Sequence, residues 1–159
     1  LMSSWVSHLP PDIKYKQVIG HGLNKDELKR NTKLDKYWVQ NLNIDLRLPL
    51  ENNSIDYVLI VAGWQYLQFP EQIAYECSRI TKPKGKIIVS FSNRAFWNKA
   101  PNIWVNSNDT QRLNYVASIL LANGWKNPFI INENRIGPNM FNFFKFPSDP
   151  FLSLISEKS

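Results

Sequence analysis

Short apolar runs alternate along the chain with segments in which apolar residues recur every three or four positions. The apolar runs have the length of β-strands and cover residues 16–20, 37–40, 55–62, 86–91, 129–131 and 151–156. Segments 25–31, 70–80 and 110–123 have helical periodicity. Strands that alternate with helices predict βαβ units and a mainly parallel sheet.

Capping residues mark the predicted ends of the helices. Asn24 suits the N-cap of the first helix, and Pro70 suits the first position of the second. Asp109 or Thr110 is predicted to cap the third helix, which Gly124 ends.

The most apolar run, residues 55–62, is predicted to be a central strand that is covered on both faces. A polar, proline-containing loop at residues 48–54 precedes it, and residues 82–85 are predicted to form a turn before the next strand.

The composition excludes several classes of protein. The 159 residues are 43% hydrophobic and 20% charged, which excludes an intrinsically disordered chain and suits one domain over residues 1–159. No run of about 18 apolar residues is present, so no transmembrane helix is expected. Cys77 is the only cysteine, which rules out an internal disulfide and a cysteine-based zinc site. A cytoplasmic setting is therefore expected.

The net charge is positive, with 19 Lys and Arg against 13 Asp and Glu, hence +6. The bases are spread along the chain, apart from a cluster at residues 82–86. A solvated basic surface and attraction to an anionic substrate or nucleic acid both remain open. A nucleic-acid partner is not expected unless these bases gather around one site.

Two ordered motifs resemble the class I S-adenosylmethionine (SAM)-dependent methyltransferases. Residues 48–58 are similar to the LPF-type loop and following strand of that family, and residues 80–90 are similar to its LKPGG-type turn and next strand. Residues 3–10, 20–24 and 91–94 are similar to a methyltransferase-type-11-like branch found in bacteria.

The resemblance implies an α/β, Rossmann-like fold with a mostly parallel twisted sheet, helices on both faces and an antiparallel last strand. Ligands bind such sheets outside the carboxyl ends of the strands. The first strand of the family would lie before Leu1, so we expect a single methyltransferase-like domain that is truncated at its N-terminus relative to the family.

The resemblance also implies a SAM site, beginning with the turns after the first two strands of the family. Ser3 and Ser4 stand where the family has a glycine-rich turn, and they suit either cofactor contact or an ordinary helix cap. Gly22 stands where the family has a carboxylate that binds the ribose hydroxyls. His21 beside it suits a ribose contact or simple packing.

The next two strand ends complete the implied cofactor site. Asn41 replaces a family aspartate near the adenine amino group, and its amide oxygen can still accept that hydrogen bond. Leu42 can offer its backbone N–H to the ring. Ala62 ends the predicted strand 55–62 and Gly63 follows it, where a glycine permits close approach of the cofactor.

Aromatic and polar residues near the same edge are candidates for binding the methyl acceptor. They are Trp64, Tyr66, Asn93, Arg94 and Trp104. An aromatic wall suits a sulfonium, because the ring face attracts a cation. Packing in the core is the alternative for the tryptophans, and stacking on a neighbouring ring is the alternative for Arg94.

Two functions follow from these observations. The first is SAM-dependent methyl transfer to a small-molecule acceptor, which requires no metal and for which the sequence nominates no catalytic base. The second is a catalytically silent methyltransferase-like domain that acts as a binding or interaction module. The missing glycine turn and the absent carboxylate at Gly22 favour the second function, whereas Asn41, Gly63 and the aromatic loop favour the first. The sequence indicates no particular oligomeric state.

Overall fold

The computed structural model describes residues 8–133 and 150–159. Its elements are β1 (Ile19–Gly22), α1 (Lys25–Arg30), β2 (Lys36–Val39), β3 (Ile55–Val61), η1 (Trp64–Tyr66), α2 (Pro70–Ile80), β4 (Thr81–Phe91), α3 (Asn102–Val105), α4 (Asp109–Ala122), β5 (Phe129–Glu133) and β6 (Phe151–Glu157). None of the helices in these two ranges is long and apolar enough to cross a bilayer.

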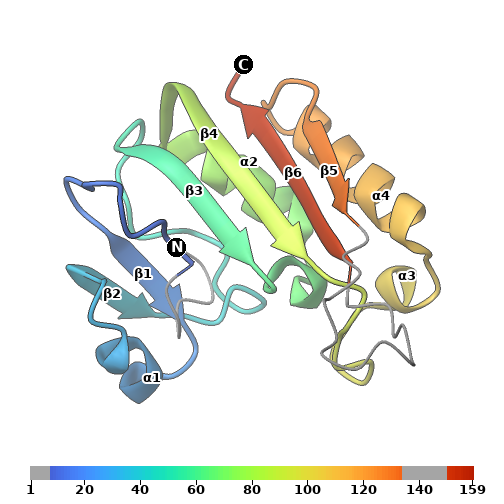
Figure 1. Ribbon diagram of the computed structural model, residues 1–159, viewed down its shortest axis with the longest axis horizontal. Helices are drawn as coiled ribbons and strands as arrows, with labels where there is room; N and C mark the ends of the chain where they lie inside the picture. Colours follow the sequence, from blue (N-terminus) through green and yellow to red (C-terminus); the bar gives the residue numbers. More distant parts are fainter. Residues whose placement is uncertain (1–7, 134–149) are drawn as a thin grey trace, which may run out of the picture.

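The strands form a two-stranded and a four-stranded sheet (Figure 1). β1 and β2 are parallel, and the larger sheet has the order β3-β4-β6-β5. β3 and β4 are parallel, whereas β6 is antiparallel to both of its neighbours, which confirms the antiparallel last strand. The arrows of β1 to β4 point the same way, so their carboxyl ends share one edge of the molecule.

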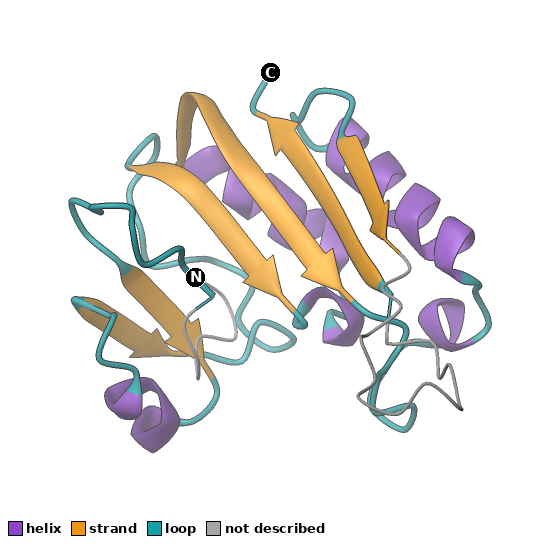
Figure 2. Ribbon diagram, viewed as in Figure 1, coloured by secondary structure: helices purple, strands orange, loops and turns teal. Residues whose placement is uncertain are grey.

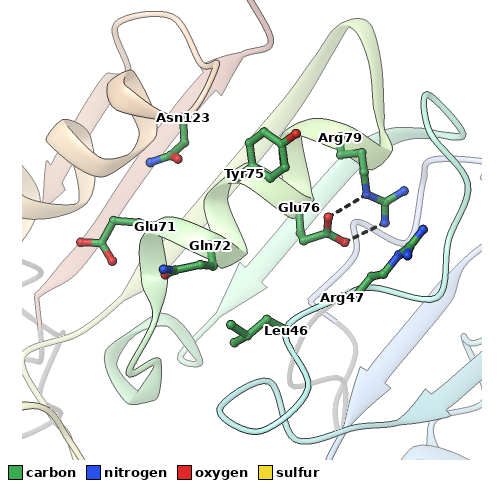
Figure 3. A pocket seen from close by; sticks show the side chains of 8 residues that line it. All are labelled: Leu46, Arg47, Glu71, Gln72, Tyr75, Glu76, Arg79 and Asn123. Carbon is green, nitrogen blue, oxygen red and sulfur yellow. Dashed lines mark hydrogen bonds and ion pairs between the residues drawn. The ribbon is translucent and has the colours of Figure 1, made fainter.

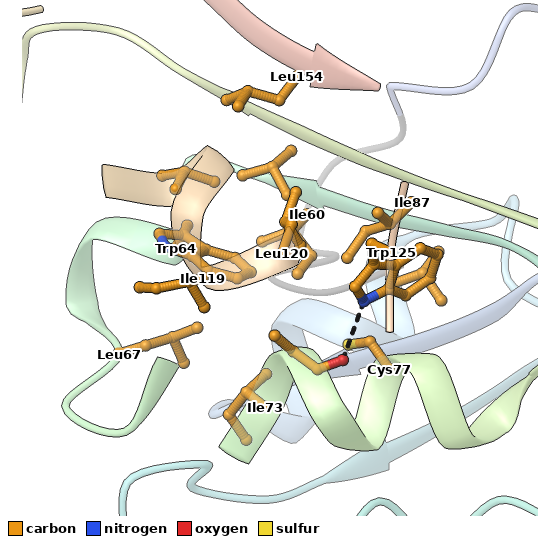
Figure 4. Packing of buried hydrophobic residues seen from close by; sticks show 14 of the residues in the cluster. Ile60, Trp64, Leu67, Ile73, Cys77, Ile87, Ile119, Leu120, Trp125 and Leu154 are labelled. Carbon is orange, nitrogen blue, oxygen red and sulfur yellow. Dashed lines mark hydrogen bonds between the residues drawn. The ribbon is translucent and has the colours of Figure 1, made fainter. Parts of the chain in front are cut away.

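Helices α2 and α4 cover one face of the four-stranded sheet, and α1 lies beside β1 and β2 (Figure 2). Alternate residues of β3, β4 and β6 face these helices, because side chains alternate along a strand. Ile60, Ile87 and Leu154 are nearly or fully buried and pack with residues of α2 and α4 (Figure 4). The indole Nε1 of Trp125 donates to the Ala74 carbonyl, 3.1 Å away, and joins α2 to the segment after α4.

Cys77 lies in this core and is fully buried. Burial raises the pKa of its thiol to about 12. The thiol is therefore protonated at neutral pH and serves as packing.

Several predicted boundaries hold. Asn24 caps α1 by accepting a hydrogen bond from the backbone N–H of Asp26, and α2 begins at Pro70. Gly124, with φ of 85°, follows the end of α4 in the left-handed conformation that favours glycine. The cap of α4 is Asn108 instead of Asp109 or Thr110, because Asn108 and Gln111 exchange two hydrogen bonds in a capping box.

Two predictions about the strands are wrong. Residues 82–85 do not separate two elements, because β4 runs from Thr81 to Phe91 and pairs with β3 on both sides of a register shift. Among the described residues, β3 is also an edge strand and not a central one, since it pairs only with β4. Tyr57 on the face away from α2 is 59% exposed. The apolar run predicted this strand correctly. Which strands lie beside it depends on the strand order of the whole sheet.

Candidate functional site

The loops that follow β2, β3 and β4 are joined at the carboxyl edge. Asn43 Nδ2 donates to the carbonyl oxygen of Tyr66 (2.9 Å), and Asn43 Oδ1 accepts from the backbone N–H of Gln68 (2.9 Å). The hydroxyl oxygen of Tyr66 in turn accepts from the backbone N–H of Phe96 (3.1 Å). Three segments that are distant in sequence therefore converge on Tyr66, where the sequence analysis predicted ligand binding.

His21, near the end of β1, packs against Trp38, and its contact with the ribose stays a prediction. Its side chain is buried, with 5% exposed, and its ring centroid lies 5.2 Å from that of Trp38. Nε2 lies 2.8 Å from the carbonyl oxygen of Gln40, so this nitrogen carries the hydrogen and donates. Burial lowers the pKa of His21 below its ordinary value of 6.5, so the ring is neutral at physiological pH.

Gly22 ends β1 and contributes only backbone to this region. The acidic side chains that follow it, Asp26 and Glu27, are exposed in the first turn of α1. Neither stands at the position where the resemblance implies a ribose-binding carboxylate. That position is Gly22, and its contact with the cofactor stays a prediction.

Asn41 and Leu42 form a tight turn after β2. The Asn41 carbonyl accepts from the backbone N–H groups of Ile44 (2.9 Å) and Asp45 (3.0 Å), and its side-chain oxygen accepts from the N–H of Asn43 (3.0 Å). Leu42 is buried in the core, which anchors the turn. An amide oxygen has two lone pairs, so Asn41 Oδ1 retains acceptor capacity for a ligand.

Ala62 follows β3 in an unusual backbone conformation. Its φ is 51°, in the left-handed region that few residues other than glycine adopt, and its N–H donates to the Ser90 carbonyl (2.8 Å). Gly63 comes next. Such outliers cluster at ligand sites. The pair forms a turn with small side chains between the ends of β3 and β4.

The candidate acceptor residues divide into two groups. Trp64 and Trp104 are each 2% exposed and belong to the hydrophobic core, which favours the packing alternative, and their contact with an acceptor stays a prediction. Trp64 packs near Leu67, Ile73 and Ile119 on the helix side of the sheet (Figure 4). In η1 its side chain points from the carboxyl ends of the strands toward the helices. The ring of Trp104 meets that of Phe91 edge-on at 4.8 Å.

The second group is nearer to solvent. The Tyr66 ring lies 6.3 Å from that of Phe96, whose side chain is 67% exposed. Asn93 and Arg94 are exposed in the same loop after β4. Ser3 and Ser4 lie outside the described residues.

Two residues of this region were not predicted from the sequence. Arg112 is a buried cation of α4 that pairs with Asp109 (2.9 Å), with its guanidinium carbon 5.8 Å from the ring centres of Trp97 and Trp104. Gln40 links β2 to the turn after it. No sequence signal marks either residue, because their roles depend on partners brought together by folding.

A cavity of about 610 Å³ lies away from this edge, on the outer side of α2 (Figure 3). Arg79 and Glu76 line it and form an ion pair of 2.7 Å. Arg79 also donates to the carbonyl oxygens of Leu48 and Leu50, so this surface stabilises the loop before β3.

Comparisons with known proteins agree with the sequence motifs. A family model described as a methyltransferase domain matches residues 4–89, which is more than half of the 159 residues. No curated protein matched the chain.

The chain is also similar to several solved structures. A SAM-dependent methyltransferase from Thermotoga maritima, named as a possible histamine N-methyltransferase, has a TM-score of 0.63 at 16% identity, over 89% of this chain and 73% of its own. A SAM-dependent methyltransferase from Mesorhizobium loti has a TM-score of 0.59 at 15% identity, over 89% and 80%. The [4+2]-cyclase SpnF has a TM-score of 0.62 at 13% identity, over 89% and 66%. At these identities the likeness establishes the fold, which is the Rossmann-like fold that the motifs predicted.

Proposed function

Since this chain belongs to the methyltransferase domain family, we propose that it binds SAM along the carboxyl edge of β1 to β4 and transfers the methyl group to a small-molecule acceptor. The observation that carries this proposal is the convergence of three loops on Tyr66 through Asn43 and Phe96. In open α/β sheets this edge is where ligands bind.

The described residues fit the adenine end of SAM. Asn41 Oδ1 is a suitable acceptor for the adenine amino group, and the N–H of Leu42 is a suitable donor to the ring. Ala62 and Gly63 bring a methyl group and no side chain to the turn after β3, which suits close approach of the cofactor. At the ribose end Gly22 offers backbone groups alone, which predicts weaker binding than a carboxylate would give.

When bound, SAM supplies a methyl group on a sulfonium, which is already activated for transfer. The chain then has to align the acceptor and exclude water, and it needs no protein nucleophile. Tyr66 and the loop of Asn93 and Arg94 are our candidates for holding the acceptor. Trp64 and Trp104 support these segments from the core.

A silent binding module is the second candidate function, and the absence of a side chain at Gly22 favours it. The likeness to a chain named as a [4+2]-cyclase illustrates that one fold carries more than one activity. Cofactor binding distinguishes the two candidates.

Calorimetric titration with SAM and with S-adenosylhomocysteine tests the proposal. We expect binding in the micromolar range, or about −8 kcal/mol. No heat and no thermal shift at millimolar cofactor would overturn the enzyme assignment and leave the binding module. Once an acceptor is found, Asn93→Ala and Arg94→Ala should impair turnover and spare SAM affinity. An equal loss of turnover and of SAM affinity would mean that this loop does not hold the acceptor.

A further inference from the structure

Gln40 follows β2, and every polar group of its side chain is used. The indole Nε1 of Trp38 donates to Gln40 Oε1 (2.7 Å). Gln40 Nε2 donates to the carbonyl oxygens of Asp45 (3.0 Å) and Arg47 (2.8 Å). An indole N–H only donates and a carbonyl oxygen only accepts, so these partners determine which end of the amide is nitrogen.

The backbone of Gln40 is also engaged. Its N–H donates to the carbonyl oxygen of Gly22 (3.2 Å), and its own carbonyl accepts from His21 Nε2 (2.8 Å). Gln40 therefore joins the ends of β1 and β2 to the segment that follows. Glutamine is the residue that this arrangement requires, because a glutamate lacks the two donors and an asparagine is one methylene shorter.

The segment that Gln40 holds is the turn with the candidate adenine contacts. This turn reverses at Asn41, whose carbonyl accepts from two later N–H groups, and Arg47 N–H donates to Asp45 Oδ1 (3.2 Å). Beyond it, the N–H of Leu48 donates to Glu76 Oε2 (2.9 Å) on α2. The turn is thus held by α2 through Leu48, and by Gln40 through the carbonyl oxygens of Asp45 and Arg47.

From these contacts we propose that Gln40 is a positioning residue, which holds residues 41–47 in the conformation that presents Asn41 and Leu42 to adenine. The inference rests on the proposed function and adds to it a residue that need not touch the cofactor itself. A turn that is already ordered loses less conformational entropy when the ligand binds, so the ligand binds more tightly. Removal of the two Nε2 donors should therefore weaken the affinity for adenosyl ligands.

The test is Gln40→Glu, which keeps the size of the side chain and turns a carboxylate toward two carbonyl oxygens. We expect the Kd for S-adenosylhomocysteine to rise about tenfold, the effect of roughly one hydrogen bond. Amide hydrogen exchange of residues 43–47 should become faster without ligand.

Two control variants separate positioning from general destabilisation. Gln111→Glu makes the same chemical change at a glutamine whose Oε1 accepts from the backbone N–H of Asn108, and glutamate keeps this hydrogen bond because it keeps the oxygen. Asn108→Ala removes the capping box of α4 and lowers stability far from residues 41–47. Both variants should bind S-adenosylhomocysteine within about twofold of wild type, because sites that share no partner couple by less than about 0.5 kcal/mol.

Each outcome decides one question. A Gln40→Glu variant with wild-type affinity, or an Asn108→Ala variant that loses as much affinity, refutes the role of Gln40 and leaves the proposed function intact. A wild-type protein that does not bind the ligand refutes the proposed function itself, and the role of Gln40 toward adenine with it.

Discussion

Two glycines of β1 differ in what their lack of a side chain does. A Cβ at Gly20 would lie 2.4 Å from Leu34 Cδ1, closer than carbon atoms can approach, so a side chain there requires a larger movement of Leu34. A Cβ at Gly22 would lie 3.2 Å from Leu28 Cδ2, the far end of a flexible side chain. Position 22 can therefore accept a side chain after a small movement of Leu28.

This difference allows a gain-of-affinity test. We expect Gly22→Asp to tighten SAM binding about tenfold or more, because a charged acceptor on a ribose hydroxyl contributes roughly 1.5–3 kcal/mol. Calorimetric titration measures the change, and Gly22→Asn is the control of similar size without the charge. Unchanged affinity in a folded Gly22→Asp protein would mean that the ribose does not lie at the end of β1.

At the scale of elements, α2 holds the loop before β3 through one ion pair. Arg79 contacts Glu76 through Nε and Nη2, both at 2.7 Å, and the two side chains are 17% and 12% exposed. Arg79 Nη1 donates to the Leu50 carbonyl (2.9 Å) (Figure 3 shows the pair). The hydrogen bond from Arg79 lowers the pKa of Glu76 below its ordinary value of 4.5.

Glu76→Gln should cost about 1–3 kcal/mol of unfolding free energy at neutral pH, because a hydrogen-bonded charge is lost. The folded state has the lower pKa, so the contribution of Glu76 is present above pH 4.5 and is lost as the pH falls below that value. Denaturant titrations at neutral and acidic pH should therefore show a difference from wild type that shrinks in acid.

Glu71→Gln on the exposed side of the same helix is the matched control, with an expected loss well under about 1 kcal/mol. A pH-independent loss in Glu76→Gln, or an equal loss in Glu71→Gln, would contradict the role of the ion pair.

At the scale of the molecule, the hydrophobic core is unevenly distributed. The buried cluster comes from the four-stranded sheet, α2, α4 and the segments near them, whereas Trp38 of β2 packs against it only in part. Among the described residues, β1 and β2 pair with each other and with no strand of the larger sheet. The two sheets are therefore expected to differ in local stability.

Native-state hydrogen exchange should show that amides of β1 and β2 exchange through a local opening, at lower free energy than those of β4 and β6. SAM should raise protection in β1 and β2 most, because the proposed site spans Gly22 and Asn41 on one side and Gly63 on the other. Exchange of all strands through one global opening would contradict this division.

The amino-acid sequence by itself determined the order of the elements and several of their ends. Pro70 and Gly124 act through their own backbone preferences, and Ala62 and Gly63 follow β3 as the motif order predicted. Only the tertiary structure decided that Trp64 lies in the core, that β3 pairs with β4 alone among the described strands and that Gln40 reaches two carbonyls beyond it. Propensity and periodicity act between near neighbours, whereas these features depend on which distant segments meet and which face each side chain takes.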